Sequence, residues 1–197
     1  MATDDDDREM RRALRRRLIA ARAAIDPARR RDYDVAIAAR LEEIAALADA
    51  GVIAVYWPFR SEPDLAGLYA RWWAAGRTLA LPVTDTPDGG LEFCRWEEAD
   101  ELVADRFGIM TPKLRRPVVP DCLLIPCVGF VRHEGSVWRL GYGAGYYDRT
   151  LARRPIPSVG VAYDECDAQG QFKPTALDAP MTAVATPSRV ITSIASP

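Results

Sequence analysis

Histidine is almost missing from this 197-residue sequence, and its scarcity excludes several kinds of chemistry. A single histidine, His133, is too few for a Cys/His zinc site of the usual spacing or for a histidine-based metalloenzyme. The sequence also has no Gly-x-Ser-x-Gly motif, so a hydrolase triad is not expected. Because His133 stands next to Glu134 and Gly135, we interpret it as a solvated turn residue rather than a catalyst.

Long apolar runs are missing as well. The longest, residues 123–131, is too short to span a bilayer and is interrupted by Pro126. No apolar core precedes a cleavage site near the N-terminus, so we expect neither export nor a membrane partner. The cysteines form no Cys-x-x-Cys pair and stand at Cys94, Cys122, Cys127 and Cys166. We expect them to be reduced, mostly buried thiols in a cytoplasmic protein.

A strong excess of charge of one sign is also lacking, because 26 basic and 28 acidic residues leave a net charge of −2. A nucleic-acid partner for the arginine-rich segment 8–31 is an alternative, but the acidic residues 4–7 and the net charge argue against it. The acidic tip predicts a disordered terminus over residues 1–7. The length predicts a single domain over residues 1–197, which we expect to act as a monomer.

Apolar spacing and turn residues predict alternating helices and strands. The expected helices cover residues 8–24, 26–51, 65–75 and 145–153. The expected strands cover residues 52–57, 78–81, 91–96, 122–125, 158–162 and 183–186, with 128–131 continuing the strand 122–125. This alternation is typical of an α/β sheet that helices cover on both faces, with ligands bound beyond the strand ends.

A glycine-rich segment is the most informative part of the sequence. Gly141, Gly143 and Gly145 occupy alternate positions, where the missing Cβ lets the backbone approach a ligand closely. Backbone N–H groups that lead into a helix N-terminus attract phosphate groups. Arg139 and Arg149 flank the loop with positive charge that suits phosphate oxygens. The segment therefore predicts a site for a nucleotide triphosphate.

This glycine loop does not match the common phosphate-binding motifs. It has no lysine for a Walker loop, and Tyr146 stands where the dinucleotide fingerprint needs a glycine. The alternative interpretation is a tight turn with its tyrosines in the core. The flanking arginines and the carboxylate of Asp148, a hard oxygen ligand of the kind that Mg²⁺ prefers, favour the phosphate site.

Three other segments carry related chemistry. Arg11 and Arg15 share a helix face, although a solvated face is the simpler alternative. Glu62 follows a strand and an aromatic segment, where it could accept hydrogen bonds from a flat ring stacked on the aromatic groups. The alternative there is a capped helix start. Asp178 is either a second acidic ligand or a turn residue.

Together these segments resemble the 5-formyltetrahydrofolate cyclo-ligase family, from about Arg11 to Thr186. Residues 139–148 match the family signature Arg-Leu-Gly-x-Gly-x-Gly-Tyr-Tyr-Asp without a gap. The resemblance implies an α/β fold, a three-layer α/β/α sandwich with a mostly parallel central sheet. It also implies a carbon–nitrogen ring-forming ligase that uses ATP and Mg²⁺ to cyclise 5-formyltetrahydrofolate to 5,10-methenyltetrahydrofolate, with release of ADP and phosphate.

The resemblance further implies roles for particular residues. ATP-binding roles fall on Arg11, Arg12, Arg15, Arg139, Leu140, Gly141, Tyr142, Gly143, Ala144, Gly145, Tyr146 and Tyr147. Substrate-binding roles fall on Trp57, Glu62, Tyr142, Gly143, Ala144, Gly145 and Tyr146. Catalytic roles fall on Arg149 and Tyr147, and metal-binding roles on Asp148 and Asp178. The expected partners are therefore ATP, 5-formyltetrahydrofolate and Mg²⁺, with no nucleic acid.

Two positions depart from the family pattern. Val131 and Thr182 stand where the family usually has an aspartate. These departures keep a second interpretation open, in which the protein is a non-catalytic or differently specific relative that binds ATP or a folate. ATP turnover that depends on 5-formyltetrahydrofolate would separate the two interpretations.

Overall fold

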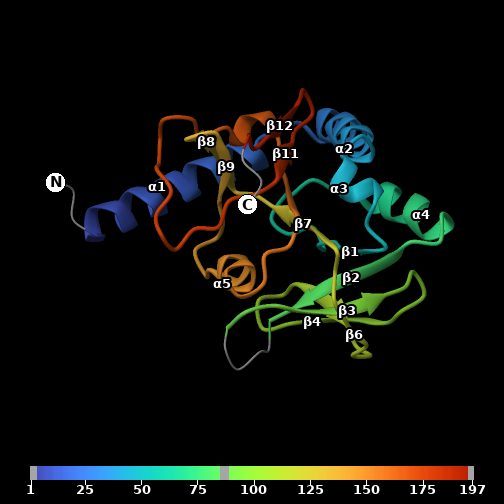
Figure 1. Cartoon of the computed structure of the whole chain (residues 1–197). Coiled ribbons are helices and arrows are strands. Elements are labelled where there is room, and N and C mark those ends of the chain that lie inside the picture. The colour runs from blue at the N-terminus through green and yellow to red at the C-terminus, as the bar shows by residue number, and fades with distance from the viewer. Residues whose placement is uncertain (1–3, 85–88, 195–197) are drawn as a thin grey trace.

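A mixed sheet lies at the centre of the protein, whose computed structural model describes residues 4–84 and 89–194. Within these residues, eight strands join in the order β12-β11-β10-β7-β1-β2-β3-β6 (Figure 1). They are β1 (Val52–Ala54), β2 (Thr78–Val83), β3 (Glu92–Trp96), β6 (Pro117–Val118), β7 (Cys122–Pro126), β10 (Ser158–Val161), β11 (Ala183–Ala185) and β12 (Val190–Thr192). The five central strands, from β11 to β2, are parallel, and antiparallel strands complete both edges.

Helices cover both faces of this sheet, as the sequence predicted. They are α1 (Asp4–Ala23), α2 (Pro27–Glu42), α3 (Ala45–Ala48), α4 (Ala66–Ala74), α5 (Tyr146–Arg153) and the short 3₁₀ helix η1 (Asp164–Cys166). Side chains alternate along β1, so Ile53 joins the core under α2, α3 and α4, and Ala54 joins the core under α5. The predicted α/β sandwich with a mostly parallel centre is confirmed.

The N-terminal segment differs from the expectation. Residues 4–7 form the first turn of α1 instead of a disordered terminus, and residues 1–3 lie outside the described residues. Carboxylates are favourable in the first turn of a helix because they face its unpaired N–H groups. Asp7 also pairs with Arg11 one turn later, at 3.0 Å between Oδ2 and Nε. The charges that suggested disorder therefore support the helix.

The expected helix over residues 26–51 is interrupted. It begins as predicted after Asp26, whose side chain accepts hydrogen bonds from two backbone N–H groups, but it ends at Glu42. Ile44 is extended, with φ −85° and ψ 115°, and turns the chain into α3.

None of the helices in the described ranges combines the length and apolarity that a membrane span requires.

A separate hairpin follows β7, so residues 128–131 do not continue the strand 122–125 as expected. Its strands β8 (Gly129–His133) and β9 (Ser136–Leu140) pair with each other in their own sheet. The chain turns between them at Glu134 and Gly135, which have φ of 50° and 81°, at the predicted turn. A second small sheet joins β4 (Leu102–Ala104) to β5 (Met110–Pro112).

α1 packs against the β8–β9 hairpin. Leu14 and Leu18 share a small core with Val128, Val131 and Leu140. Val131 is 2% exposed, so the position at which the family usually has an aspartate is filled by a buried apolar contact. An unpaired carboxylate would be costly in this place because the neighbouring side chains are apolar.

The chain changes direction across the sheet between β1 and β7. β1 leads to β2 on one side, whereas β7 leads to β10 on the other. Ligands of such sheets bind at the carboxyl ends of the strands beside this switch point. The segment after β1 carries Glu62, and β7 leads through the hairpin to the glycine loop, so the two candidate segments meet at this place.

Candidate active site at the glycine loop

Two of the three loop glycines have a backbone that a side chain would strain. Gly143 and Gly145 have φ of +102° and +69°, in the left-handed region that favours glycine. A Cβ on Gly145 would lie 2.7 Å from an Nη atom of Arg149. Gly141 differs from the expectation, since its φ is not positive and a Cβ there would meet no described atom within 4 Å. The loop is thus bent at two glycines, not three.

Guanidinium groups lie against both of these bends. Arg15 donates a hydrogen bond from Nε to Gly141 O at 2.8 Å, and its guanidinium is the nearest group to a Cβ on Gly143. Arg149 donates from Nε to Gly89 O at 2.7 Å, with its guanidinium 5.2 Å from the ring centre of Tyr146. A phosphate group in the loop would therefore meet positive charge from two sides.

The other two predicted arginines of α1 behave differently from Arg15. Arg11 is 8% exposed and donates from Nη2 to Asp178 Oδ2 at 3.0 Å and to Lys173 O at 2.6 Å. Arg12 points away from this face, with a 72% exposed side chain near Glu9. The structure does not bring Arg12 to the glycine loop, so its role in ATP binding stays a prediction.

The two predicted metal ligands lie on neighbouring segments. Asp148 Oδ1 accepts hydrogen bonds from Arg139 Nη2 at 2.6 Å and from Ala179 N at 3.1 Å, one residue beyond Asp178. Asp178 Oδ2 already accepts from Arg11 and from the N–H and hydroxyl groups of Thr175. No group of three or more metal-ligating side chains occurs among the described residues. The residues fit Mg²⁺ in its usual mode, in which one or two carboxylates and the substrate phosphates supply the ligands.

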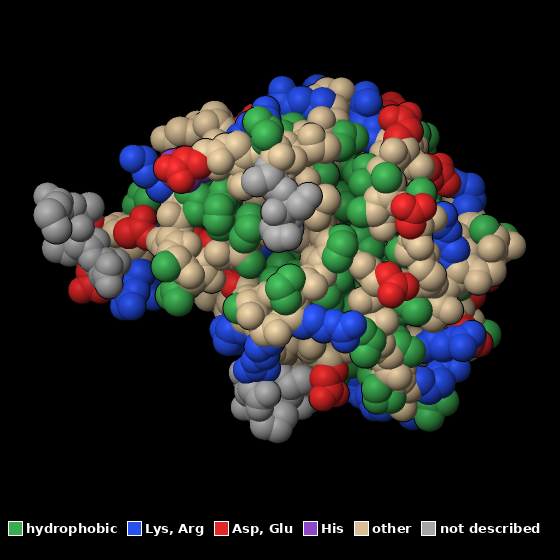
Figure 2. Space-filling view, viewed as in Figure 1, with side chains coloured by type: hydrophobic (Ala, Val, Ile, Leu, Met, Phe, Trp, Pro, Cys, Tyr) green, Lys and Arg blue, Asp and Glu red, His purple; other side chains and the backbone are tan. Residues whose placement is uncertain are grey.

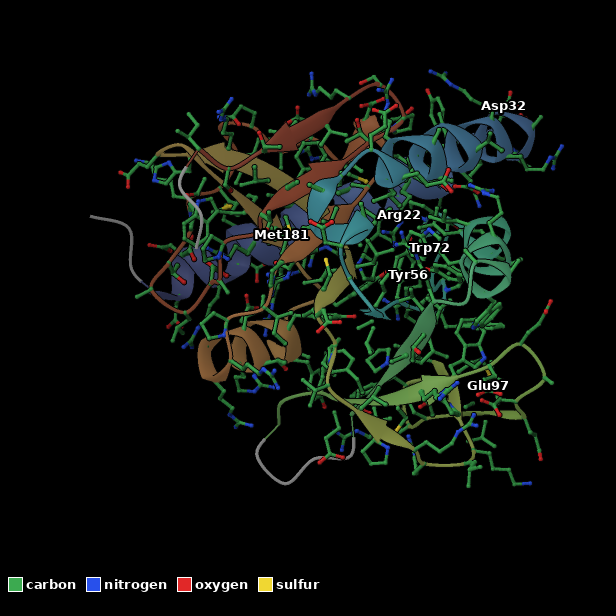
Figure 3. The ribbon with its side chains drawn as sticks, turned by 45° about the vertical axis from the view of Figure 1, so that its right-hand side comes forward. Arg22, Asp32, Tyr56, Trp72, Glu97 and Met181 are labelled. Carbon is green, nitrogen blue, oxygen red and sulfur yellow. The ribbon has the colours of Figure 1, made fainter. Side chains whose placement is uncertain are left out.

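A partly buried hydrogen-bonded network connects the glycine loop to Glu62. Arg22 Nη2 donates to Tyr142 Oη at 2.6 Å, and Tyr142 Oη donates to Glu62 Oε1 at 2.9 Å. The second carboxylate oxygen, Glu62 Oε2, accepts from Phe59 N at 2.9 Å. Glu62 and Arg22 are 5% and 1% exposed. In Figure 3 Arg22 lies in the interior of the molecule.

Burial changes the protonation of this network. It raises the pKa of Glu62 from its ordinary value of 4.5 to about 7, against the opposing charge of Arg22 and the hydrogen bonds from Phe59 and Tyr142. Burial also raises the pKa of Tyr142 and of Tyr147 above the ordinary value. Both phenols are therefore hydrogen-bond donors near neutral pH, and Glu62 is poised between its neutral and charged forms.

The two predicted aromatic walls lie in different places. Trp57 is 36% exposed and borders a cleft of about 510 Å³, whose lining does not include Glu62. The cleft is lined by Trp57, Ala66, Tyr69, Ala70, Trp73, Trp96, Glu98, Asp100, Leu102 and Met110. Tyr146 instead begins α5, with its hydroxyl accepting from Arg106 and its ring 6.1 Å from that of Phe107. Flat rings are thus available both beside the cleft and beside the loop.

Leu140, Ala144 and Tyr147 complete the predicted set. The side chain of Leu140 is 1% exposed and packs in the core against α1, so only its backbone can face a ligand. Ala144 is exposed in the loop. The ring of Tyr147 lies 5.8 Å from the Arg139 guanidinium, beside the ion pair with Asp148.

Thr182, the second position at which the family usually has an aspartate, has a structural role. Its N–H donates to Ser158 O at 2.8 Å, and its Oγ1 accepts from Ser158 N at 3.1 Å. The side chain therefore completes the pairing between the segments of β10 and β11. No hydrogen bond joins Thr182 to Asp148 among the described residues, where Asp148 contacts Arg139 and Ala179.

Sequence reasoning missed Arg22. A signal was present, because Arg11, Leu14, Leu18 and Arg22 recur at helical spacing along one face of α1. An arginine on the same face as two core leucines must find acceptors inside the protein. Arg106 was also missed, and its contact with Tyr146 across 40 residues has no local signal.

Comparisons with known proteins agree with this fold and loop. The sequence model of the 5-formyltetrahydrofolate cyclo-ligase family matches residues 7–187. The 5-formyltetrahydrofolate cyclo-ligase of Escherichia coli (strain K12) is 34% identical over 178 residues, which are 86% of this chain and 96% of that protein. The NMR structure of Aquifex aeolicus 5,10-methenyltetrahydrofolate synthetase has a TM-score of 0.80 and 26% identity, with 95% of both chains covered. The 5,10-methenyltetrahydrofolate synthetase structure from Mycoplasma pneumoniae, at 23% identity, has a TM-score of 0.71, covers 90% of this chain and 98% of its own, and shows the same fold.

Proposed function

The chain belongs to the 5-formyltetrahydrofolate cyclo-ligase family, a family of ATP-using ligases, and we propose how its own residues carry out that reaction. The product is 5,10-methenyltetrahydrofolate, with ADP and phosphate released. One observation carries the proposal: the glycine loop contacts the guanidinium groups of Arg15 and Arg149, and through Tyr142 it also contacts the buried carboxyl of Glu62. A single loop can therefore hold a phosphate and a folate next to each other.

The phosphate groups of ATP are proposed to bind at the bends of the glycine loop. Arg15 and Arg149 supply positive charge beside Gly143 and Gly145. Phosphoryl transfer requires positioning and charge neutralisation more than a covalent nucleophile, so this arrangement suits the reaction. Arg11 contributes indirectly, because its ion pair with Asp178 orients that carboxylate.

Mg²⁺ is proposed to bind beside Asp148. Asp178 is the second proposed ligand, because the next residue, Ala179, donates its backbone N–H to Asp148. A bound Mg²⁺ would neutralise developing charge on the phosphate oxygens. Arg139 orients the Asp148 carboxylate through its 2.6 Å contact. Both hydrogen bonds of the Asp148 carboxylate end on Oδ1. This supports Oδ2 as the oxygen that coordinates the cation.

The pterin ring is proposed to bind at Glu62, with Tyr146 as a wall on the loop side. The remainder of the folate contains an aromatic ring, and the cleft beside Trp57 and Trp96 offers apolar surfaces for it. Glu62 can accept or share a proton with ring nitrogens near neutral pH because burial raises its pKa to about 7. This arrangement would place the formyl group between Glu62 and the phosphates.

The chemistry follows from that placement. The formyl oxygen attacks the γ-phosphorus of ATP, and the bond from phosphorus to ADP breaks. The neighbouring nitrogen of the folate then attacks the activated carbon and loses its proton, while phosphate leaves with the former formyl oxygen. Arg149 and Tyr147 are proposed to stabilise the transferring group by charge and by a hydrogen bond. Much of the rate then comes from proximity.

Small molecules are the partners that we propose. The face in Figure 2 carries acidic and basic side chains interspersed, and the net charge is −2, which support a protein without a nucleic-acid partner. Salt-dependent binding to duplex DNA or RNA would contradict this. We also propose that the protein acts as a monomer in the cytoplasm, and sedimentation at micromolar concentration would test the monomer.

The decisive test is to mix the protein with 5-formyltetrahydrofolate, ATP and Mg²⁺ and follow the near-ultraviolet absorbance of the methenyl product. An absorbance rise that requires all three components is expected. A flat trace from folded protein would overturn the proposal and favour the non-catalytic or differently specific relative.

Glu62→Gln is expected to weaken folate use while ATP binding survives, and Glu43→Gln, at an exposed helix end, serves as the matched control.

A further inference from the structure

The hydroxyl of Tyr142 joins three segments that are far apart in the sequence. It accepts a hydrogen bond from Arg22 on α1 and donates one to Glu62 after β1, while its own backbone belongs to the glycine loop. Position 142 is one of the unspecified positions of the family signature. The contact is therefore a property of this chain that its glycine motif does not account for.

The segment that carries Glu62 needs external support. Arg60 and Ser61 both have positive φ, 47° and 61°, a backbone that costs roughly 1–3 kcal/mol for each residue without surrounding restraint. Arg22 supplies restraint by donating two hydrogen bonds to Arg60 O, at 2.9 and 3.1 Å. The same guanidinium holds Cys127 O at 3.3 Å, at the end of β7. Arg22 thus fixes the switch point of the sheet and the Glu62 segment as one unit.

We propose that Tyr142 is a positioning residue that couples the glycine loop to Glu62, so that a nucleotide in the loop sets the orientation of the carboxyl that receives the folate. The inference rests on the proposed function, because it assigns ATP to the loop and folate to Glu62. Coupling between two binding sites is reciprocal, so folate must strengthen ATP binding by the same factor as ATP strengthens folate binding.

The ring and the hydroxyl of Tyr142 have separate contacts. The ring lies 6.0 Å from the ring of Phe59 and 5.9 Å from the guanidinium of Arg60, whereas the hydroxyl alone reaches Glu62. The side chain is also 37% exposed. Tyr142→Phe therefore removes the coupling contact and keeps the packing, so the variant is expected to fold.

The experiment measures folate binding with and without a non-hydrolysable ATP analogue, by calorimetry on the full chain. Wild-type protein is expected to bind 5-formyltetrahydrofolate more tightly when the analogue is present. In Tyr142→Phe we expect that enhancement to disappear, and the KM for folate to rise about tenfold or more, the size typical of losing a hydrogen bond to a charged group. Binding of the ATP analogue measured without folate should change much less, because the coupling acts only when both ligands are bound. Tyr33→Phe, a tyrosine on α2 whose ring packs against Tyr163, is the matched control.

Two outcomes would overturn the inference. Unchanged enhancement in Tyr142→Phe would mean that the hydroxyl transmits nothing between the sites. An equal rise of both KM values with the enhancement retained would mean that the hydroxyl has a general structural role. Neither result would affect the proposed function, which fails only if wild-type protein forms no methenyl product.

Discussion

Replacing Glu62 by glutamine should change how the stability of the ligand-free protein depends on pH. Glu62 is 5% exposed, and burial raises its pKa to about 7 from an ordinary value of 4.5. The folded state therefore holds this proton more tightly than the unfolded state. The resulting stabilisation is fully present below pH 4.5 and is lost as the pH rises through 7. Glutamine cannot titrate, so the variant does not lose this part of its unfolding free energy as the pH rises.

The magnitude follows from the two pKa values. The gap between 4.5 and 7 corresponds to about 3 kcal/mol of unfolding free energy, of which about 2.5 kcal/mol falls between pH 5 and pH 8. Wild-type protein should lose this amount relative to Glu62→Gln over that interval. Asp34, whose pKa burial raises to about 6, is present in both proteins, so its contribution cancels in the difference.

Urea unfolding at pH 5, 6, 7 and 8 measures the difference directly. The exposed Glu43 provides the control, since Glu43→Gln should follow wild type at every pH. A difference between Glu62→Gln and wild type that stays constant with pH would refute the reasoning. It would mean that the Arg22 charge and the hydrogen bonds offset the cost of burial and leave Glu62 ionised throughout.

Three further predictions concern the glycine loop. Arg149→Ala is expected to raise the KM for ATP about tenfold and more than that for folate, because a charge-assisted phosphate contact is lost; equal rises in steady-state assays would contradict the role. Gly145→Ala is expected to lower the unfolding free energy by about 1–2 kcal/mol because its φ is +69°, and Gly141→Ala, with open space for a Cβ, should lower it less in the same urea titration. Chelating Mg²⁺ is expected to abolish turnover without shifting the unfolding midpoint of the ligand-free protein, since Asp148 already pairs with Arg139; a lowered midpoint would indicate a structural metal instead.

Local sequence signals predicted most of the elements but not all of their ends. The cap at Asp26 and the turn at Gly135 were predicted where the structure has them, because side-chain capping and positive φ are decided within a few residues. The break at Ile44 was missed because a continued apolar stripe suits one long helix and two short ones equally. The acidic residues 4–7 were misjudged because composition alone does not distinguish a solvated tail from a helix start.

The sequence by itself determined the loop chemistry. Gly143 and Gly145 permit the bends, and Arg149 and Asp148 lie within a turn of them, so their proximity follows from chain connectivity. The tertiary structure decided the rest: Arg22 meets Tyr142 across 120 residues and Tyr142 meets Glu62 across 80. Such contacts depend on how α1 packs on the hairpin and on the order of the strands at the switch point. The spacing of residues along one chain does not contain that information, because the partners are chosen by the shared burial of distant segments.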